Sequence, residues 1–135
     1  MTDPGMTDPG RTDTASNGPA THRTPADTAS AYFDGWRRHD AESLRDVLAE
    51  DIVFDGPMGH VEGLEDNIAS LHGLLGIVRD VVIRHVFVDG ADVATVYDLH
   101  TTVAAEPLLV VNWSHVVDGR ITTMRVVFDP RPLVG

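Results

Sequence analysis

The polar side chains best placed to contact a bound molecule lie near the C-terminal end of the chain, in the run PLLVVNWSHVV. Asn112 and Ser114 alternate there with Val110 and Val116, and alternate residues of a β-strand point to the same face. On an apolar face, such a hydrogen-bonding pair would fix the orientation of a substrate. If neighbouring backbone groups satisfy the pair instead, the two side chains have a structural role.

Three further side chains are candidates for catalysis, and each has an alternative structural role. Tyr32 could orient a ligand oxygen, or it could be a core aromatic residue of a helix. Asp55, at the end of a short strand, could act as a base, or it could accept N–H bonds in the turn at Gly56-Pro57. His60, in the loop that follows, could serve as an acid or a base, or it could be an exposed loop residue.

The histidine and cysteine content of the chain does not indicate a metal site. There are seven histidines and no cysteine. Without cysteine, neither disulfides nor thiolate metal sites can form. The histidines show no ligand spacing such as His-x-x-x-His. We therefore expect no metal ion and no cofactor.

Two hairpins must position the polar pair. Asp118-Gly119 separates two β-branched runs within Pro107 to Asp129, and Asp-Gly here predicts a type I′ turn, whose central residues have positive φ. An earlier hairpin, Val81 to Val88 and Val93 to Val103, is centred on Asp89-Gly90. The sequence therefore predicts four long antiparallel strands.

Helices are predicted before these hairpins. Residues 1–23 contain almost nothing that could be buried, so we expect a disordered leader followed by a domain over residues 24–135. Thr24 can cap a first helix that begins at Pro25, and Asp40 can cap a second, shorter one. The second helix is expected to carry Leu44, Val47 and Leu48.

A brief strand, Ile52 to Asp55, and a third helix after Gly63 complete the pattern. This order predicts an α+β domain: three N-terminal helices, one short strand and a curved antiparallel sheet of four long strands. A long twisted sheet curls, and the helices must close its concave side, which makes a cone with an internal pocket. Besides the polar candidates, we expect the pocket to be lined by Trp36, Phe54, Met58, His60, Leu71, Tyr97, Leu99, Val110, Met124, Val126 and Phe128.

Composition excludes several classes of function. With 135 residues and 42% hydrophobic content, the chain can bury one core. Its formal net charge of −11 repels phosphate backbones and anionic lipids, so we expect neither nucleic-acid nor membrane partners. No secretory signal is visible at the N-terminus, and a cytoplasmic location is expected.

Two stretches resemble a known family: YFDGWRRHDAESLRDVLAEDIVFDGPMGHVEG and VVDGRITTMRVVFD. They combine a helix with an aromatic stripe, a Gly-Leu-Glu helix start and a final Asp-Gly-Arg-Ile hairpin that ends in Phe-Asp. Over Tyr32 to Asp129 the layout is similar to the nuclear-transport-factor-2-like superfamily and, within it, the SnoaL-like group. This scaffold hosts isomerases, epoxide hydrolases, dehydratases, polyketide cyclases and non-enzymatic binders, so the resemblance implies a fold more than an activity.

The resemblance also implies which catalytic groups are missing. Tyr32 falls where a tyrosine of ketosteroid isomerase-like members helps to hold an enolate oxygen. Gly56 stands at the place of their general base, and Ser114 at the place of their second oxyanion donor. Members similar to limonene epoxide hydrolase need an Arg-x-Asp on one strand and an Asp on the last strand. Those places hold Asn112, Ser114 and Val126, so both sets of carboxylates are expected to be absent.

Two hypotheses follow. The first is a pocket enzyme, a cyclase or an isomerase, that acts on a small apolar or carbonyl-bearing ligand. The second is a non-catalytic ligand-binding or interaction module, whose cone is filled by its own side chains. A homodimer through the outer sheet face, which carries His100, Trp113 and His115, is expected in addition, because an apolar mid-sheet face is rarely left in contact with water.

Overall fold

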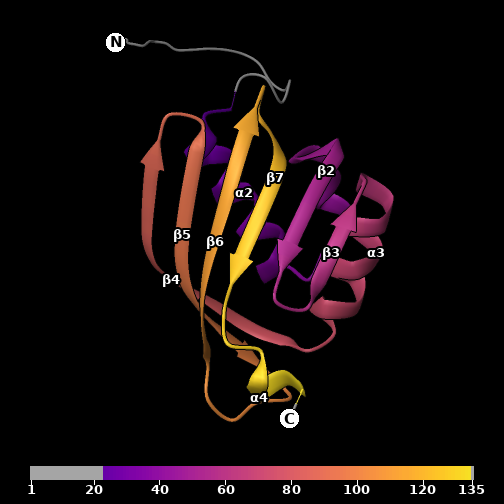
Figure 1. The fold of residues 1–135 in the computed structure, drawn as a ribbon, viewed down its shortest axis with the longest axis vertical. Coiled ribbons are helices and arrows are strands. Elements are labelled where there is room, and N and C mark those ends of the chain that lie inside the picture. The colour runs from indigo at the N-terminus through magenta and orange to yellow at the C-terminus, as the bar shows by residue number, and fades with distance from the viewer. Residues whose placement is uncertain (1–22, 135) are drawn as a thin grey trace.

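The computed structural model describes residues 23–134. These form a curved sheet with helices packed on its concave side (Figure 1). The predicted disorder of the leader falls on residues outside this range. Arg23, at the predicted end of that leader, donates a hydrogen bond from Nη2 to the Gly119 carbonyl oxygen at 3.1 Å, so it belongs to the folded part.

In the described part of the chain, six strands form one mixed sheet in the order β3-β2-β7-β6-β5-β4. The strands are β2 (Leu48–Gly56), β3 (Gly59–Glu62), β4 (Val78–Asp89), β5 (Asp92–Thr101), β6 (Leu108–Val117) and β7 (Arg120–Val127). Strands β2 and β7 pair in parallel, and all other neighbours are antiparallel. The predicted α+β cone is confirmed, with its four long strands as β4 to β7. The sheet curves around the helices and does not close into a barrel.

The first helix, α2 (Pro25–Arg37), begins where the sequence predicts. Thr24 accepts a hydrogen bond from the Asp27 backbone N–H at 3.0 Å, and Pro25 occupies the first turn, where its missing N–H costs nothing. The helix packs against β4 to β7 with its aromatic stripe, and the Phe33 ring lies 4.9 Å from the ring of Tyr97 on β5. This contact helps to hold α2 against the concave face of the sheet.

The segment after α2 differs from the prediction. The expected second α-helix is a 3₁₀ helix, η2 (Glu42–Asp46), and Leu48 already belongs to β2. The Ile121 N–H donates to the Val47 carbonyl oxygen at 2.8 Å, so pairing with β7 draws this part of the chain into the sheet. Pairing between distant segments has outweighed the local helical spacing of the apolar residues.

The predicted short strand is also longer than expected and has a partner. The sequence pattern does not predict β3, because Val61 is the only β-branched residue between Gly59 and Glu62. Register pairs such as Asp55 with His60 join β3 to β2 as a hairpin around the turn at Pro57 and Met58. This edge hairpin places one more wall beside the pocket.

The last two helices follow β3 and β7 in the chain. The third predicted helix is α3 (Leu64–Leu75), with Ile68, Leu71 and Leu75 buried against the core as its spacing indicates. The short α4 (Arg131–Val134) follows β7 and lies at the open end of the cone (Figure 1). No helix of the described residues is long and apolar enough to cross a membrane.

The β6–β7 hairpin has the predicted turn and the predicted faces. Asp118 and Gly119 have φ values of 53° and 76°, both positive as a type I′ turn requires. Along β6, residues with even numbers are buried and those with odd numbers are exposed or half-buried. Asn112 therefore points into the cone, and Trp113 points away from it.

Candidate functional site

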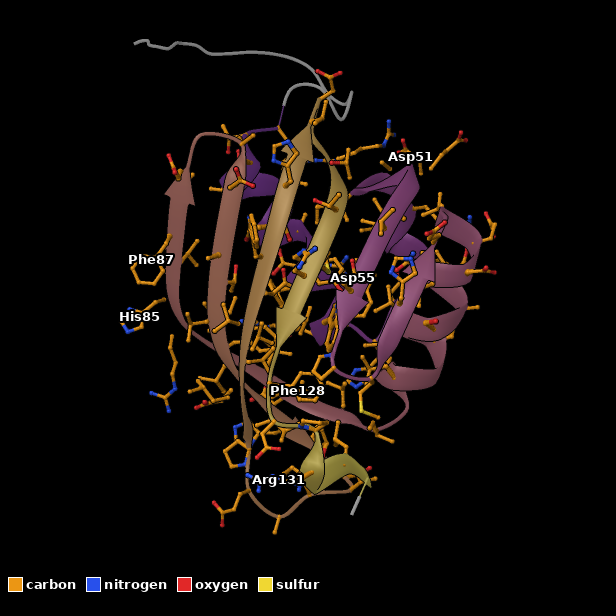
Figure 2. All side chains as sticks on the ribbon, in the orientation of Figure 1. Asp51, Asp55, His85, Phe87, Phe128 and Arg131 are labelled. Carbon is orange, nitrogen blue, oxygen red and sulfur yellow. The ribbon has the colours of Figure 1, made fainter. Side chains whose placement is uncertain are left out.

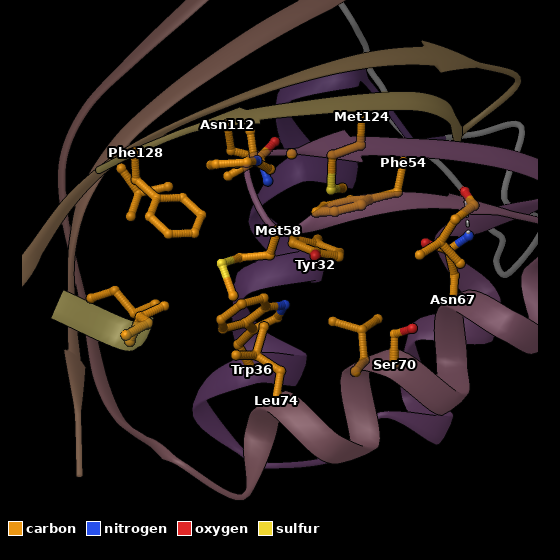
Figure 3. Close-up of a pocket in the computed structure, with 18 of the residues that line it drawn as sticks. Tyr32, Trp36, Phe54, Met58, Asn67, Ser70, Leu74, Asn112, Met124 and Phe128 are labelled. Carbon is orange, nitrogen blue, oxygen red and sulfur yellow. Dashed lines mark hydrogen bonds between the residues drawn. The ribbon is translucent and has the colours of Figure 1, made fainter. Parts of the chain in front are cut away.

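A cavity of about 400 Å³ lies between the concave face of the sheet and the helices. Its walls come from the sheet on one side and from α2 and α3 on the other (Figure 3). The residues predicted for the pocket that do line it are Tyr32, Trp36, Phe54, Met58, Leu71, Tyr97, Leu99, Val110, Asn112, Met124, Val126 and Phe128. A cone filled by its own side chains is therefore not what the structure shows.

Other lining residues are not among those named from the sequence. Asn67, Ser70 and Leu74 of α3 contribute to one wall, and Leu133 of α4 lines the cavity near the open end of the cone. The helical spacing of α3 shows its core face, but it does not show that the neighbouring face lines a cavity. Met58 has 56% of its surface exposed and stands at the β2–β3 turn, so the cavity opens to solvent on this side.

Asn112 is the polar side chain that the sheet presents to the cavity. Only 2% of its surface is exposed, and its Oδ1 accepts a hydrogen bond of 2.8 Å from Ser114 Oγ. Its Nδ2 has no hydrogen-bond acceptor among the described residues and faces the cavity (Figure 3). Ser114 is equally buried but does not line the cavity. The predicted polar pair thus exists, and one member of it lines the cavity.

Tyr32 and Trp36 lie one turn apart on α2 and contribute polar groups from the opposite wall. The centroids of their rings are 5.9 Å apart. Two effects act on the pKa of the Tyr32 hydroxyl, and the smaller one, the nearby Trp36 indole, lowers it. Burial is the larger effect and raises the pKa of Tyr32 well above the ordinary value. Burial likewise raises the pKa of Tyr97. Both phenols therefore remain neutral hydroxyl groups at neutral pH.

The indole N–H of Trp36 is the one unexpected polar feature of this wall. It is buried and has no hydrogen-bond partner among the described residues. An unpartnered buried N–H costs free energy, on the order of 1 to 3 kcal/mol. The sequence pattern predicts Trp36 only as an apolar lining residue, because helical spacing does not indicate which indole nitrogens stay unpaired.

Asp55 and His60 lie elsewhere, and their predicted place at the pocket is wrong. Phe54 points inward, so Asp55 points to the outer face of β2 (Figure 2). His60 Nδ1 lies 2.5 Å from Asp55 Oδ1, and its Nε2 lies 2.7 Å from Glu62 Oε2. The hydrogen bonds to Asp55 and then to Glu62 raise the pKa of His60. The three side chains form a solvent-exposed cluster that ties β3 to β2.

The polar side chains that line the cavity are therefore all uncharged. No Asp, Glu, His or Arg is among the described residues that line it. Nor do three His, Asp or Glu side chains in this part of the chain converge in a way that would hold a metal ion. The arrangement can bind an apolar body and donate hydrogen bonds to an oxygen on it. It offers no lining group that titrates near neutral pH and could move a proton.

A family model described as a SnoaL-like domain matches residues 29–124. No curated protein matches the chain. Among solved structures, the chain is similar to an NTF2-like protein of unknown function from Cytophaga hutchinsonii. The two sequences are 28% identical, the TM-score is 0.74, and the match covers 83% of this chain and 96% of that one. An LEH-like epoxide hydrolase from M. tuberculosis has 25% identity and a TM-score of 0.66, over 78% of this chain and 82% of that one. A steroid delta-isomerase from Pseudomonas aeruginosa, at 22% identity and a TM-score of 0.68 over 78% and 80%, shares the fold.

Proposed function

Because the chain belongs to the family of SnoaL-like domains, we propose that it binds a largely apolar small molecule inside its cone. The observation that carries this proposal is the cavity of about 400 Å³, whose apolar walls surround a few neutral polar groups. Ligand pockets typically occupy roughly 300 to 1,000 Å³ and combine apolar walls with a small number of polar groups that orient the ligand. This cavity has both properties.

The binding proposed here depends on shape, apolar contact and hydrogen bonding, and it does not require acid–base catalysis. By the resemblance to ketosteroid isomerase-like and epoxide hydrolase-like members, the places of their carboxylates fall on Gly56, Ser114 and Val126, and the place of an arginine falls on Asn112. Among these, Gly56, Asn112 and Val126 line the cavity, and none of them has a side chain that titrates. The epoxide hydrolase similarity therefore extends to the fold, and its chemistry is not part of the proposal.

A thermal-shift screen of apolar, carbonyl-bearing compounds tests the proposal. A ligand at 100 times its dissociation constant adds about 2.7 kcal/mol to the free energy of unfolding. For a folded part of this size, that gain corresponds to a rise of roughly 10 °C in melting temperature. If no compound in a broad panel raises the melting temperature, the cavity is not a ligand site.

A second candidate, a cyclase or an isomerase, is favoured by the unpartnered donors. The Tyr32 hydroxyl and the Asn112 amide could polarise a bound carbonyl without an ionised residue. The test is to incubate each stabilising compound with the protein and analyse it by mass spectrometry and chromatography. A compound that is recovered chemically unchanged, at catalytic and at stoichiometric protein concentrations, indicates binding without turnover.

The outer face of the sheet supports a further part of the proposal, a homodimer. Phe87 of β4 stands on this face and is exposed (Figure 2), as are Leu109, Trp113 and Val127. Register pairs connect these strands into one surface, with Phe87 beside Ala94 and Ala94 beside Trp113. A monomer rarely leaves such a contiguous apolar patch in water, and a two-fold contact with a second copy would cover it.

A further inference from the structure

We propose that Ser114 sets the ligand preference of the cavity, by holding the Asn112 amide with its nitrogen toward the ligand. Ser114 is then a positioning residue, since it does not itself line the cavity. The inference rests on the proposed function, because it concerns the ligand of the same cavity. The inference predicts the chemistry of the ligand, which should present a carbonyl-type oxygen to Asn112 and no O–H or N–H donor at that point.

The contact that carries the inference joins two buried side chains on one strand. Ser114 and Asn112 are two residues apart on β6, so both point to the concave face. Ser114 Oγ and Asn112 Oδ1 are 2.8 Å apart, and only 3% and 2% of the two residues are exposed. A hydrogen bond shielded from water to this degree restricts both side chains.

The direction of this hydrogen bond decides which end of the amide meets the ligand. The Ser114 hydroxyl has no other acceptor among the described residues, so donating to Oδ1 gives its proton a partner. If the amide were reversed, Ser114 would accept from Nδ2, and its own proton would be buried without a partner. The Nδ2 protons, in contrast, face the cavity, where water or a ligand can accept them. The arrangement with Nδ2 inward therefore leaves fewer groups unsatisfied.

The opposite wall points to the same ligand chemistry. Tyr32 keeps its proton because burial raises its pKa, so its hydroxyl can donate to a ligand oxygen. The neighbouring Trp36 N–H adds a second donor on the same helix and is unpartnered in this part of the chain. No carboxylate of the described residues lines the cavity to accept a proton. The polar groups on α2 are therefore donors, and the lining side chains of α3 that could accept a hydrogen bond, Asn67 and Ser70, lie away from Asn112 (Figure 3).

A carbonyl oxygen suits this environment and a hydroxyl does not. The carbonyl accepts from Asn112 Nδ2 with its lone pairs and brings no donor of its own. An alcohol with the same carbon skeleton can accept the same bond, but its O–H is then buried without an acceptor. We therefore expect the ketone of a matched pair to bind about tenfold more tightly than its alcohol, the effect of one unmet hydrogen bond.

The experiment measures this ratio for three matched pairs by isothermal titration calorimetry. The pairs are 2-decalone and 2-decalol, cyclododecanone and cyclododecanol, and 2-undecanone and 2-undecanol. In Ser114→Ala the amide can rotate, and the preference for the ketone should fall from about tenfold to about threefold or less, since part of the orientation is lost. Ser114→Thr keeps the hydroxyl and should restore the wild-type ratio.

Thr95→Val is the matched control for these variants. Thr95 is buried and lies opposite Asn112 in the register of β5 and β6, but it does not line the cavity. Its substitution also removes a buried hydroxyl near Asn112, and the ketone preference should stay at the wild-type value. A purely structural role of Ser114 would lower the melting temperature of Ser114→Ala and leave the ratio unchanged.

A measurement on the wild-type protein alone completes the test. In a ¹⁵N-labelled sample, the side-chain amide protons of Asn112 should show nuclear Overhauser effects to protons of the lining residues. Effects to the Ser114 β-protons without any to lining residues would mean that the amide is reversed, and would overturn the inference. Equal binding of ketones and alcohols by the wild-type protein would also overturn it. If no member of any pair binds the wild-type protein, the inference fails, and the broad thermal-shift screen then decides whether the proposed function fails with it.

Discussion

Ser114 donates a hydrogen bond to Asn112 at 2.8 Å, yet only Asn112 of these two neighbours on β6 lines the cavity. One residue therefore faces the cavity, and the other forms a hydrogen bond to it from outside the cavity lining. On α2, Tyr32 and Trp36 both line the cavity, and the Trp36 indole N–H has no hydrogen-bond partner among the described residues. Polar groups left without protein partners carry a cost in the free protein, and a ligand can recover that cost.

Replacing Asn112 with Leu should separate ligand binding from stability. Leu keeps the volume nearly constant and removes the donor, so the ligand-dependent gain in stability should fall by about 1 to 1.5 kcal/mol. The ligand-free variant should be as stable as the parent or slightly more stable, because an unpartnered amide inside the cone is a desolvation cost. Chemical denaturation with and without a stabilising ketone measures both quantities. A clear loss of stability without ligand would show that the amide serves the fold.

Trp36→Phe should stabilise the ligand-free protein. The change removes a buried N–H that has no partner among the described residues and keeps most of the ring. We expect a gain of about 1 kcal/mol in the free energy of unfolding, from the unmet hydrogen bond that is removed, less some lost packing. Urea denaturation measures it. A loss of 2 kcal/mol or more would indicate that a water molecule or another group satisfies this N–H in solution.

Val126→Trp should block the cavity. Val126 lines the cavity and is only partly buried, so a larger side chain can enter the space at a modest cost to the fold. Compounds that raise the melting temperature of the parent by roughly 10 °C should shift this variant by less than about 3 °C. Thr123→Trp on the same strand is the control, because Thr123 is exposed on the opposite face. Undiminished shifts in Val126→Trp would place the ligand outside the cone.

Trp113→Glu should weaken the proposed homodimer. Trp113 is 49% exposed on the outer face and donates from Nε1 to Asp92 Oδ1 at 2.9 Å, so a carboxylate at this place would also face the Asp92 charge. We expect a shift from dimer to monomer in light scattering. Val86→Glu is the control, since Val86 is equally exposed at 49% but pairs with the inward-facing Thr95. A parent protein of monomeric mass would rule out the dimer.

The cluster of Asp55, His60 and Glu62 should make stability depend on pH. The hydrogen bonds to Asp55 and Glu62 raise the folded-state pKa of His60 above 6.5, so protonated His60 stabilises the folded state. This contribution is complete below about pH 6.5 and is lost as the pH rises through the folded-state pKa. Arg125 of β7, which pairs with Asp55 in the sheet, is a further charged neighbour of the cluster.

His60→Gln isolates this effect, because all other histidines are present in both proteins. The melting temperature of the parent should exceed that of the variant by more at pH 5.5 than at pH 9. Circular dichroism melts across this range provide the comparison. A difference between the two proteins that does not change with pH would show that the cluster is held together by uncharged hydrogen bonds alone.

The sequence by itself determined the features that depend on local pattern. Alternation along a strand assigns Asn112 to one face and Trp113 to the other, and Asp118-Gly119 predicts a turn with positive φ at both residues. The α+β order of elements follows from changes of hydrophobic period, and most of the lining residues follow from the inward parity of the strands. These predictions succeed because side-chain direction is set by the backbone of the residue itself.

Only the tertiary structure decided the pairing of distant segments and its consequences. The parallel pairing of β2 with β7 lengthens the first strand, and the β2–β3 hairpin joins Asp55 to His60 on the outer face. Which polar groups end without a partner is likewise a property of the packed molecule. Ser114 reaches Asn112 and leaves its nitrogen free, while Trp36 keeps an unpaired N–H in the described chain, because partners are chosen among groups that folding brings together.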